Sequence, residues 1–338
     1  MPLMTHLTTV MLITSAATCL QAEPPQDSDS TPATGIDAVS RQFYKEMDNY
    51  THPPVDSIII NSRTGVSLEF IYVPPGQYTV GRDIGNTETL LRLTGQQASR
   101  LDEGPERQIK FERGFYFARR QVTAAEFATF LNDVEPTVAA KSIVLTSRSN
   151  LRREPSGRYS AKEGADRFPA NTVTWEGAVE FTRWITKKTD WSMRLPTEDE
   201  WEAAARTQQG LLGPTGGPKP PTDTQTGLVP GIRPGSHEAE VDAFPENMTV
   251  NGLFHIFNTV GDWTSSVYKF DRGEKPKPVE AAIVVKREGG HVIKGWGGLT
   301  GRALGDQVGE NGIFGFRVLL EANMDGSPIR LPSMGSGK

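Results

Sequence analysis

Few side chains in this chain of 338 residues have the types and spacing that nucleophilic, redox or metal chemistry requires. Cys19 is the single cysteine, so intramolecular disulfides and thiolate metal sites are excluded beyond that position. The histidines are scattered, and no HxxxH or HExxH spacing occurs among them. No Gly-x-Ser-x-Gly sequence occurs either. The sequence therefore contains neither a motif of a metalloprotease zinc site nor a motif of a serine nucleophile.

The first 22 residues have the composition of an export signal. Residues 1–22 contain no Lys, Arg, Asp or Glu, residues 7–17 are mostly apolar, and Ala22 is a small residue before a Glu-Pro-Pro turn. This pattern predicts a signal peptide cleaved near Ala22, which would remove Cys19 from the mature chain. A lipoprotein anchored through Cys19 stays open as an alternative, and with it an association with the outer membrane. No other stretch approaches the length of a membrane span.

Composition limits the class of protein further. The net charge is -5 and no run of Lys or Arg occurs, which argues against nucleic acid as a partner. The 34 glycines and 24 prolines predict a fold rich in loops. The chain is long enough to bury a large core without disulfides.

Local patterns predict three helices and several short strands around them. Thr123, Thr174 and Thr197 are expected N-caps, and Glu126 and Glu200 complete capping boxes with the first and the last of them. Each is followed by apolar residues at helical spacing. Alternating or continuous apolar patterns predict strands at 67–73, 77–80, 109–117, 283–294 and 313–320.

Six blocks of sequence, taken in order, resemble the formylglycine-generating enzyme (sulfatase-modifying factor) family. The most specific is MRLPTEDEWEAAAR at 193–206, and the others lie at 70–81, 102–131, 168–185, 243–266 and 312–320. The resemblance implies an α+β, C-type-lectin-like domain over 65–321, with short twisted sheets, few helices and much irregular chain. A partly flexible extension at 23–64 and a loose tail at 322–338 would flank it.

The resemblance also indicates which catalytic residues of the family this chain lacks. Enzymes of this family oxidise a substrate cysteine with a pair of cysteines and a copper ion, and that pair falls near Thr300 and Gly305 here. Threonine and glycine do not supply the soft sulfur ligands that Cu(I) prefers. The absence of these two cysteines therefore excludes formylglycine generation and copper binding.

A calcium site of the family maps partly onto this chain. Placed without gaps, its side-chain positions fall on His255 and Asp262, and its main-chain oxygens on Asn258 and Val260. Asp262 suits Ca²⁺, whereas His255 does not. Asn258, Val260 and Asp262 are the candidate calcium ligands, and the alternative is a half-buried, purely structural role for His255 with no ion.

The family resemblance predicts a binding protein more readily than an enzyme. The chain is most similar to a cysteine-free periplasmic branch, in which one type of member acts upstream of a membrane Ser/Thr kinase that controls type VI secretion. We therefore expect a non-catalytic regulator whose partner is the periplasmic part of such a kinase or another envelope protein. Trp296, Arg302 and Asp306 are the candidate contact residues, with a structural role as the alternative for each.

The alternative function is a periplasmic oxidoreductase-type enzyme of siderophore (pyoverdine) maturation. It would keep the groove of the family and change the chemistry. Its candidate acid and base groups are Asp306, Glu310 and His291.

Overall fold

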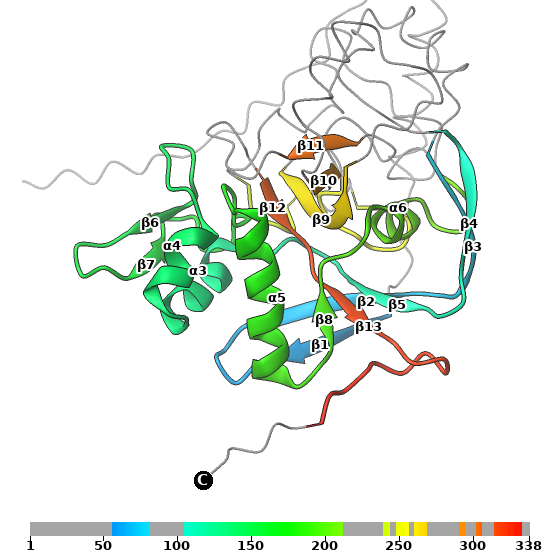
Figure 1. Cartoon of the computed structure of the whole chain (residues 1–338), viewed down its shortest axis with the longest axis horizontal. Coiled ribbons are helices and arrows are strands. Elements are labelled where there is room, and N and C mark those ends of the chain that lie inside the picture. Colours follow the sequence, from blue (N-terminus) through cyan, green and yellow to red (C-terminus); the bar gives the residue numbers. More distant parts are fainter. Residues whose placement is uncertain are drawn as a thin grey trace, which may run out of the picture.

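The computed structural model of the chain describes residues 56–81, 105–211, 239–243, 248–256, 260–268, 291–294, 302–305 and 314–332. In these ranges the chain forms short sheets and few helices, which confirms the predicted α+β class (Figure 1). No helix within them is long and apolar enough to span a membrane. The predicted leader, 1–22, lies outside the described residues.

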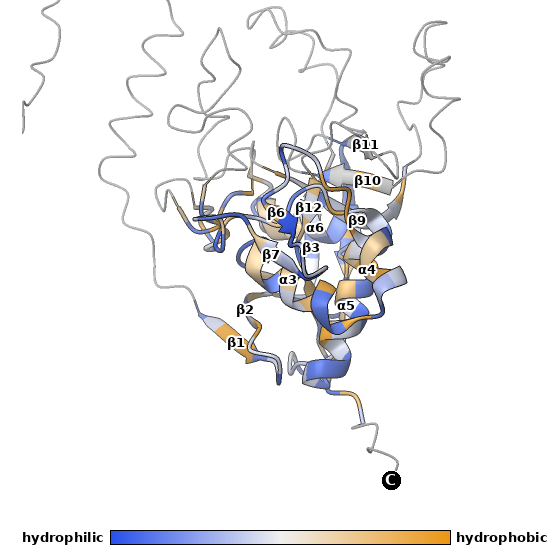
Figure 2. Cartoon of the chain, turned by 90° about the vertical axis from the view of Figure 1, so that its left-hand side faces the viewer, coloured by the Kyte–Doolittle hydropathy of each residue, from blue (hydrophilic) through white to orange (hydrophobic). Residues whose placement is uncertain are grey.

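Antiparallel pairing builds the central sheet. Its five strands follow the order β1-β2-β5-β13-β8, and every neighbouring pair is antiparallel. These strands are β1 (Ser57–Asn61), β2 (Ser67–Val73), β5 (Phe115–Ala118), β8 (Met193–Arg194) and β13 (Leu319–Glu321). The apolar β1 lies at the edge of this sheet, where Figure 2 shows it in orange.

Side chains alternate between two apolar cores, one on each face of the central sheet. Phe70 and Leu320 belong to one core, whereas their neighbours Ile71 and Leu319 belong to the other. This follows from strand geometry, because successive side chains point to opposite faces. The first core is covered by helices α3 (Ala124–Asp133) and α5 (Trp175–Thr189), and the second by α6 (Glu198–Arg206).

The predicted helix starts are confirmed. Thr123, Thr174 and Thr197 each accept a hydrogen bond from a main-chain N–H of the first turn, and the first and last form complete capping boxes. A fourth helix, α4 (Pro136–Ser142), was not predicted. It ends against the start of α5, where Gly177 is required because a Cβ there would lie 2.1 Å from the Ser142 carbonyl oxygen.

A second sheet lies beside α6 and carries Asp262 and Lys294. Its order is β11-β10-β9-β12, and β12 runs parallel to β9. Its strands are β9 (Gly261–Val267), β10 (His291–Lys294), β11 (Ala303–Gly305) and β12 (Phe314–Phe316). Two hairpins complete the fold: β3 (Gly76–Val80) with β4 (Arg107–Phe111), and β6 (Leu151–Arg153) with β7 (Tyr159–Ala161).

Two predicted strands are each divided in two. The segment 109–117 contains the end of β4, which pairs with β3, and most of β5, which pairs with β2. The segment 313–320 contains β12 and most of β13, which belong to different sheets. In both cases the apolar pattern continues while the chain bends from one sheet into another. Of the strand expected at 283–294, only 291–294 lies in the described residues.

The ordered domain extends beyond both expected boundaries. β1 pairs with β2 over its whole length, so the sheet begins at Ser57, inside the segment assigned to the flexible extension. At the other end, Ser192 N–H donates to the Ile329 carbonyl (3.0 Å), and Leu331 N–H donates to the Asp190 carbonyl (2.7 Å). The described part of the expected loose tail, 322–332, is therefore tied to the domain.

Candidate functional site

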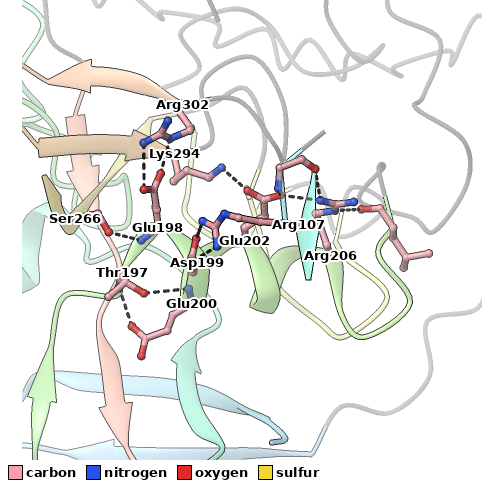
Figure 3. Close-up of polar contacts among 12 residues, drawn as sticks. Arg107, Thr197, Glu198, Asp199, Glu200, Glu202, Arg206, Ser266, Lys294 and Arg302 are labelled. Atoms are coloured by element: carbon pink, nitrogen blue, oxygen red, sulfur yellow. Dashed lines mark hydrogen bonds and ion pairs between the residues drawn. The ribbon is translucent and has the colours of Figure 1, made fainter. Parts of the chain in front are cut away.

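Helix α6 carries four carboxylates, and each of them pairs with at least one cation. Figure 3 shows the pairs of Glu198, Asp199 and Glu202. Apart from Arg206, which lies on α6 itself, the cations come from both sheets and from the β3–β4 hairpin, so the helix joins these elements. The pairs are Glu198 with Arg302, Asp199 with Arg107, Glu200 with Arg194, and Glu202 with Arg206 and Lys294.

The start of α6 is fixed by local hydrogen bonds. The Thr197 hydroxyl accepts from Glu200 N–H at 3.1 Å, and the Glu200 carboxylate accepts from Thr197 N–H at 2.8 Å. The same carboxylate accepts two hydrogen bonds from the Arg194 guanidinium, at 2.6 and 2.7 Å. Burial raises the pKa of Glu200, but the guanidinium outweighs burial and the net pKa is lowered. Glu200 is therefore ionised at neutral pH.

Glu202 lies at the centre of the most deeply buried part of this site. Lys294 Nζ lies 2.9 Å from one carboxylate oxygen, and Arg206 NH1 lies 2.7 Å from the other. Gly81 N–H also donates to the carboxylate, at 2.7 Å. The side chains of Glu202, Arg206 and Lys294 are at most 6% exposed. Multiple hydrogen bonds of this kind are what offsets the cost of removing ions from water.

A second buried ion pair joins Asp262 on β9 to Arg317 (2.8 Å). Asp262 also accepts from Gln121 Nε2 at 2.7 Å and from the Trp201 indole N–H at 2.9 Å. Complete burial lowers the pKa of Arg317, and the Asp262 carboxylate only partly opposes this shift. Asp262 is thus the counter-ion of Arg317, and it also accepts the hydrogen bond that the Trp201 indole of α6 donates.

The expected calcium site overlaps this ion pair. Val260 offers a main-chain oxygen, but that oxygen accepts a hydrogen bond from Gln121 (2.8 Å). An ion at Val260 and Asp262 would have to displace donors that the protein itself supplies. Asn258 lies outside the described residues. Calcium therefore stays a prediction.

Arg302 is the one candidate contact residue that the structure describes. Its side chain is 10% exposed, its Nε lies 2.5 Å from Glu198, and its Cζ lies 5.2 Å from the centroid of the Tyr268 ring. These contacts fasten the chain just before β11 to the first turn of α6. Trp296 and Asp306 lie outside the described residues.

The remaining candidates are placed only in part. His255 is buried, has a positive φ of 48°, and its Nε2 lies 2.5 Å from the Ala243 carbonyl oxygen. Only the main chain of His291 is described, in β10, and Glu310 lies outside the described ranges. The acid and base groups expected for an enzyme therefore stay predictions.

The described part of the site consists of paired charges. Its carboxylates pair with Arg or Lys, and in the described part of the chain no group of three or more His, Cys, Asp or Glu could hold a metal ion. Sequence reasoning missed the partners of Glu202 and Asp262. The spacing of Glu202 and Arg206 at i and i+4 was a signal for one of these pairs.

Comparison with known proteins identifies the scaffold. The family described as the sulfatase-modifying factor enzyme 1-like domain matches residues 60–321. The chain belongs to this family. The match confirms the resemblance read from the six sequence blocks, and its first residue lies within β1.

Relatives with different printed functions share this domain. The mouse formylglycine-generating enzyme is 27% identical over 270 residues, which cover 69% of this chain and 66% of that enzyme. The bovine inactive C-alpha-formylglycine-generating enzyme 2 is 34% identical over 126 residues, covering 35% of this chain and 39% of the relative. The serine/threonine-protein kinase Pkn1 of Chlamydia trachomatis is 27% identical over 206 residues, covering 60% and 28%. The chain thus spans at most about two thirds of these relatives.

A solved structure supports the fold independently. PvdO from Pseudomonas aeruginosa superposes with a TM-score of 0.50 over 80% of this chain and 99% of PvdO. The two sequences are 18% identical, so this likeness concerns the fold alone.

Proposed function

We propose that this protein is a non-catalytic, exported regulator that promotes activation of a membrane Ser/Thr kinase controlling type VI secretion. In this role it resembles the type VI secretion accessory protein TagR. The former enzyme scaffold would present a binding surface to the periplasmic part of the kinase or to another envelope protein. Long loops on a rigid core suit this purpose.

The observation that carries the proposal is the absence of cysteine from a domain whose relatives use a cysteine pair. Cys19 is the single cysteine, and it precedes the matched range of 60–321. The positions expected for the pair, near Thr300 and Gly305, offer no sulfur to Cu(I). The family chemistry therefore cannot proceed on this chain.

In the described part of the chain, the buried ion pairs of the scaffold are complete. Glu202 still binds Lys294 and Arg206, and Asp262 still binds Arg317, all in the buried interior. Buried charges without partners would destabilise the domain severely. A folded domain that lacks the cysteine pair can still bind a partner, and the proposed role requires only binding.

The names of two relatives support a regulatory role. One is called an inactive enzyme of the family, and the other, named a serine/threonine-protein kinase, aligns with this chain over 206 residues. This chain is thus similar to part of a protein named for kinase activity. This association supports a kinase as the partner in the present case.

The proposal is tested in a deletion strain. We expect phosphorylation of the kinase's target to fall when the gene is deleted and to return with the full-length chain. A version without residues 1–22 should not restore it, because the regulator would remain on the wrong side of the membrane. A pull-down of the exported protein from solubilised membranes should retain the kinase.

Two results would contradict the proposal. Unchanged target phosphorylation in the deletion strain would exclude a role in kinase activation. Conversion of the pyoverdine fluorophore precursor by the purified protein, with oxygen and added metals, would favour the enzyme alternative. The truncated version must be shown to accumulate, so that its failure reflects location rather than degradation.

A further inference from the structure

A cavity of about 410 Å³ lies between α3, the β6–β7 hairpin and the turn before β2. Figure 1 shows this hairpin against α3 on the opposite flank of the molecule from α6. The cavity is therefore separate from the ion pairs described above. Its volume falls in the range of small-molecule sites, about 300–1,000 Å³.

Two opposite charges line this cavity without neutralising each other. Arg158 and Asp166 both belong to its lining and are exposed. Among the described residues, neither side chain forms an ion pair, with the other or with any third residue. A third charged residue of the lining, Asp133, is already bound by Lys188 (2.6 Å) and by the Trp184 indole N–H (2.7 Å). One cation and one anion thus remain available to a ligand.

The main chain around both charges is held in place. The Asn132 side chain binds both main-chain groups of Tyr159, donating to its carbonyl (2.7 Å) and accepting from its N–H (2.9 Å). The carbonyl of Arg158 accepts from Glu154 N–H across the hairpin turn (2.7 Å). The carbonyl of Asp166 accepts from Ala125 N–H at the start of α3 (3.2 Å). Such preorganisation reduces the entropy lost on binding.

The rest of the lining is mixed. Ala125 and Ala128 on α3, Ala161 on β7 and the ring of Tyr159 are small or aromatic, whereas Thr64, Thr129 and Ser160 carry hydroxyl groups. Small side chains with a few hydroxyl groups suit a short ligand with two charged ends. A ligand with only one charge would leave Asp166 or Arg158 without a partner.

We propose that this cavity binds a small zwitterion, namely an amino acid or a dipeptide with both ends free. The Arg158 guanidinium would bind the carboxylate, because its fork matches the two carboxylate oxygens. The Asp166 carboxylate would bind the ammonium group. Ion pairs at exposed sites are weak, so we expect a Kd of about 0.1–1 mM that rises with salt. This site is independent of the proposed kinase partner.

Calorimetry on the full exported chain tests the proposal. The probes are alanyl-alanine, its N-acetyl form and its C-terminal amide, followed by a panel of free amino acids and other dipeptides. Each cap removes one charge, so each capped form should bind about two- to fivefold more weakly than the free dipeptide. Equal binding of free and capped forms would overturn the proposal. So would the absence of binding across the whole panel at about 10 mM.

Matched variants assign the two charges. Arg158→Gln should weaken binding of alanyl-alanine about two- to fivefold and leave the weak binding of its amide unchanged. Asp166→Asn should weaken binding of alanyl-alanine to a similar extent and leave the weak binding of the N-acetyl form unchanged. Arg148→Gln and Glu163→Gln change exposed residues outside the cavity lining and should have no effect. Equal loss in these controls would overturn the assignment.

Filling the cavity provides a test that does not depend on charge. Ala125→Leu places a larger side chain in the lining of the cavity, and leucine, like alanine, favours helix. It should abolish binding with an unchanged unfolding temperature. Retained binding in this variant would place the zwitterion elsewhere and refute the site.

Discussion

The ammonium group of Lys294 lies 2.9 Å from the carboxylate of Glu202, and both side chains are buried. Arg206, one turn further along α6, binds the other oxygen of the same carboxylate at 2.7 Å. One buried anion thereby serves two cations and joins α6 to β10 across 92 residues of sequence. The domain depends on this anion more than on any exposed ion pair, because buried charges interact in a low dielectric.

Glu202→Gln should strongly destabilise the domain. The substitution keeps the shape but removes the charge that Arg206 and Lys294 share. Breaking a buried pair from one side costs about 3–5 kcal/mol, and we expect a loss of that size in the free energy of unfolding by urea. The exposed Glu163→Gln should change it by less than about 0.5 kcal/mol. Equal values for the two variants would contradict the structure.

Asp262 and Arg317 should behave as one unit. Asp262→Asn leaves the fully buried guanidinium of Arg317 without its anion, at a cost of about 3–5 kcal/mol. Arg317→Met alone leaves the Asp262 carboxylate without its cation, and the double variant Asp262→Asn/Arg317→Met should cost less than the sum of the two single changes. Urea unfolding of the four proteins gives the coupling energy. A calcium-dependent rise in the Tm of the wild-type chain, lost in Asp262→Asn, would instead support the predicted ion.

Features that depend on neighbouring residues could be predicted from the sequence. The N-caps at Thr123, Thr174 and Thr197 involve bonds that span three residues, so residue types at fixed spacing reveal them. The strand β2 was also visible, because its apolar residues alternate before Pro74 and Pro75. The fold class was predicted from the six family-like blocks, because no local pattern determines the order of strands in a sheet.

Features that depend on distant residues could not be predicted. Asp262 and Arg317 are 55 residues apart, and nothing near Asp262 indicates that its partner is a guanidinium rather than an ion. The apolar pattern at 313–320 continues across Arg317 although β12 and β13 belong to different sheets. β1 lacks alternation because its three successive isoleucines occupy both faces at the sheet edge, so only its pairing with β2 reveals it.

Acid should weaken the domain partly through Glu200. Burial raises the pKa of this carboxyl, but Arg194 lowers it further, so the folded pKa lies below the unfolded value of 4.5. A depressed folded pKa stabilises the protein above the unfolded pKa, and this contribution is lost as the pH falls through the folded pKa. Glu200→Gln should therefore show a smaller loss of stability than wild type below about pH 4.5, measured by urea unfolding. Glutamine preserves the capping box, which isolates the effect of charge. Parallel pH profiles would contradict this assignment.

The cap of α3 should contribute measurably to stability. Thr123 accepts from Glu126 N–H at 3.2 Å, and Ala at this position would leave that donor without its partner. We expect Thr123→Ala to lower the free energy of unfolding by about 1 kcal/mol, and Thr123→Ser to lower it by less. Thermal and urea unfolding of the three proteins give these values. A serine variant as unstable as the alanine variant would assign the loss to packing of the threonine methyl group instead.

Arg302 offers a test that separates a structural role from contact with a partner. Its guanidinium binds Glu198 in the first turn of α6, and only 10% of its side chain is exposed. If Arg302 acts by fastening β11 to α6, Arg302→Gln and Glu198→Gln should reduce kinase activation to the same extent, because each breaks the same ion pair. Restoring each variant to a deletion strain and measuring target phosphorylation makes the comparison. From its burial we expect equal loss in both variants. Loss in Arg302→Gln alone would show instead that the guanidinium acts beyond this ion pair, through the Tyr268 ring or through the partner contact predicted from the sequence.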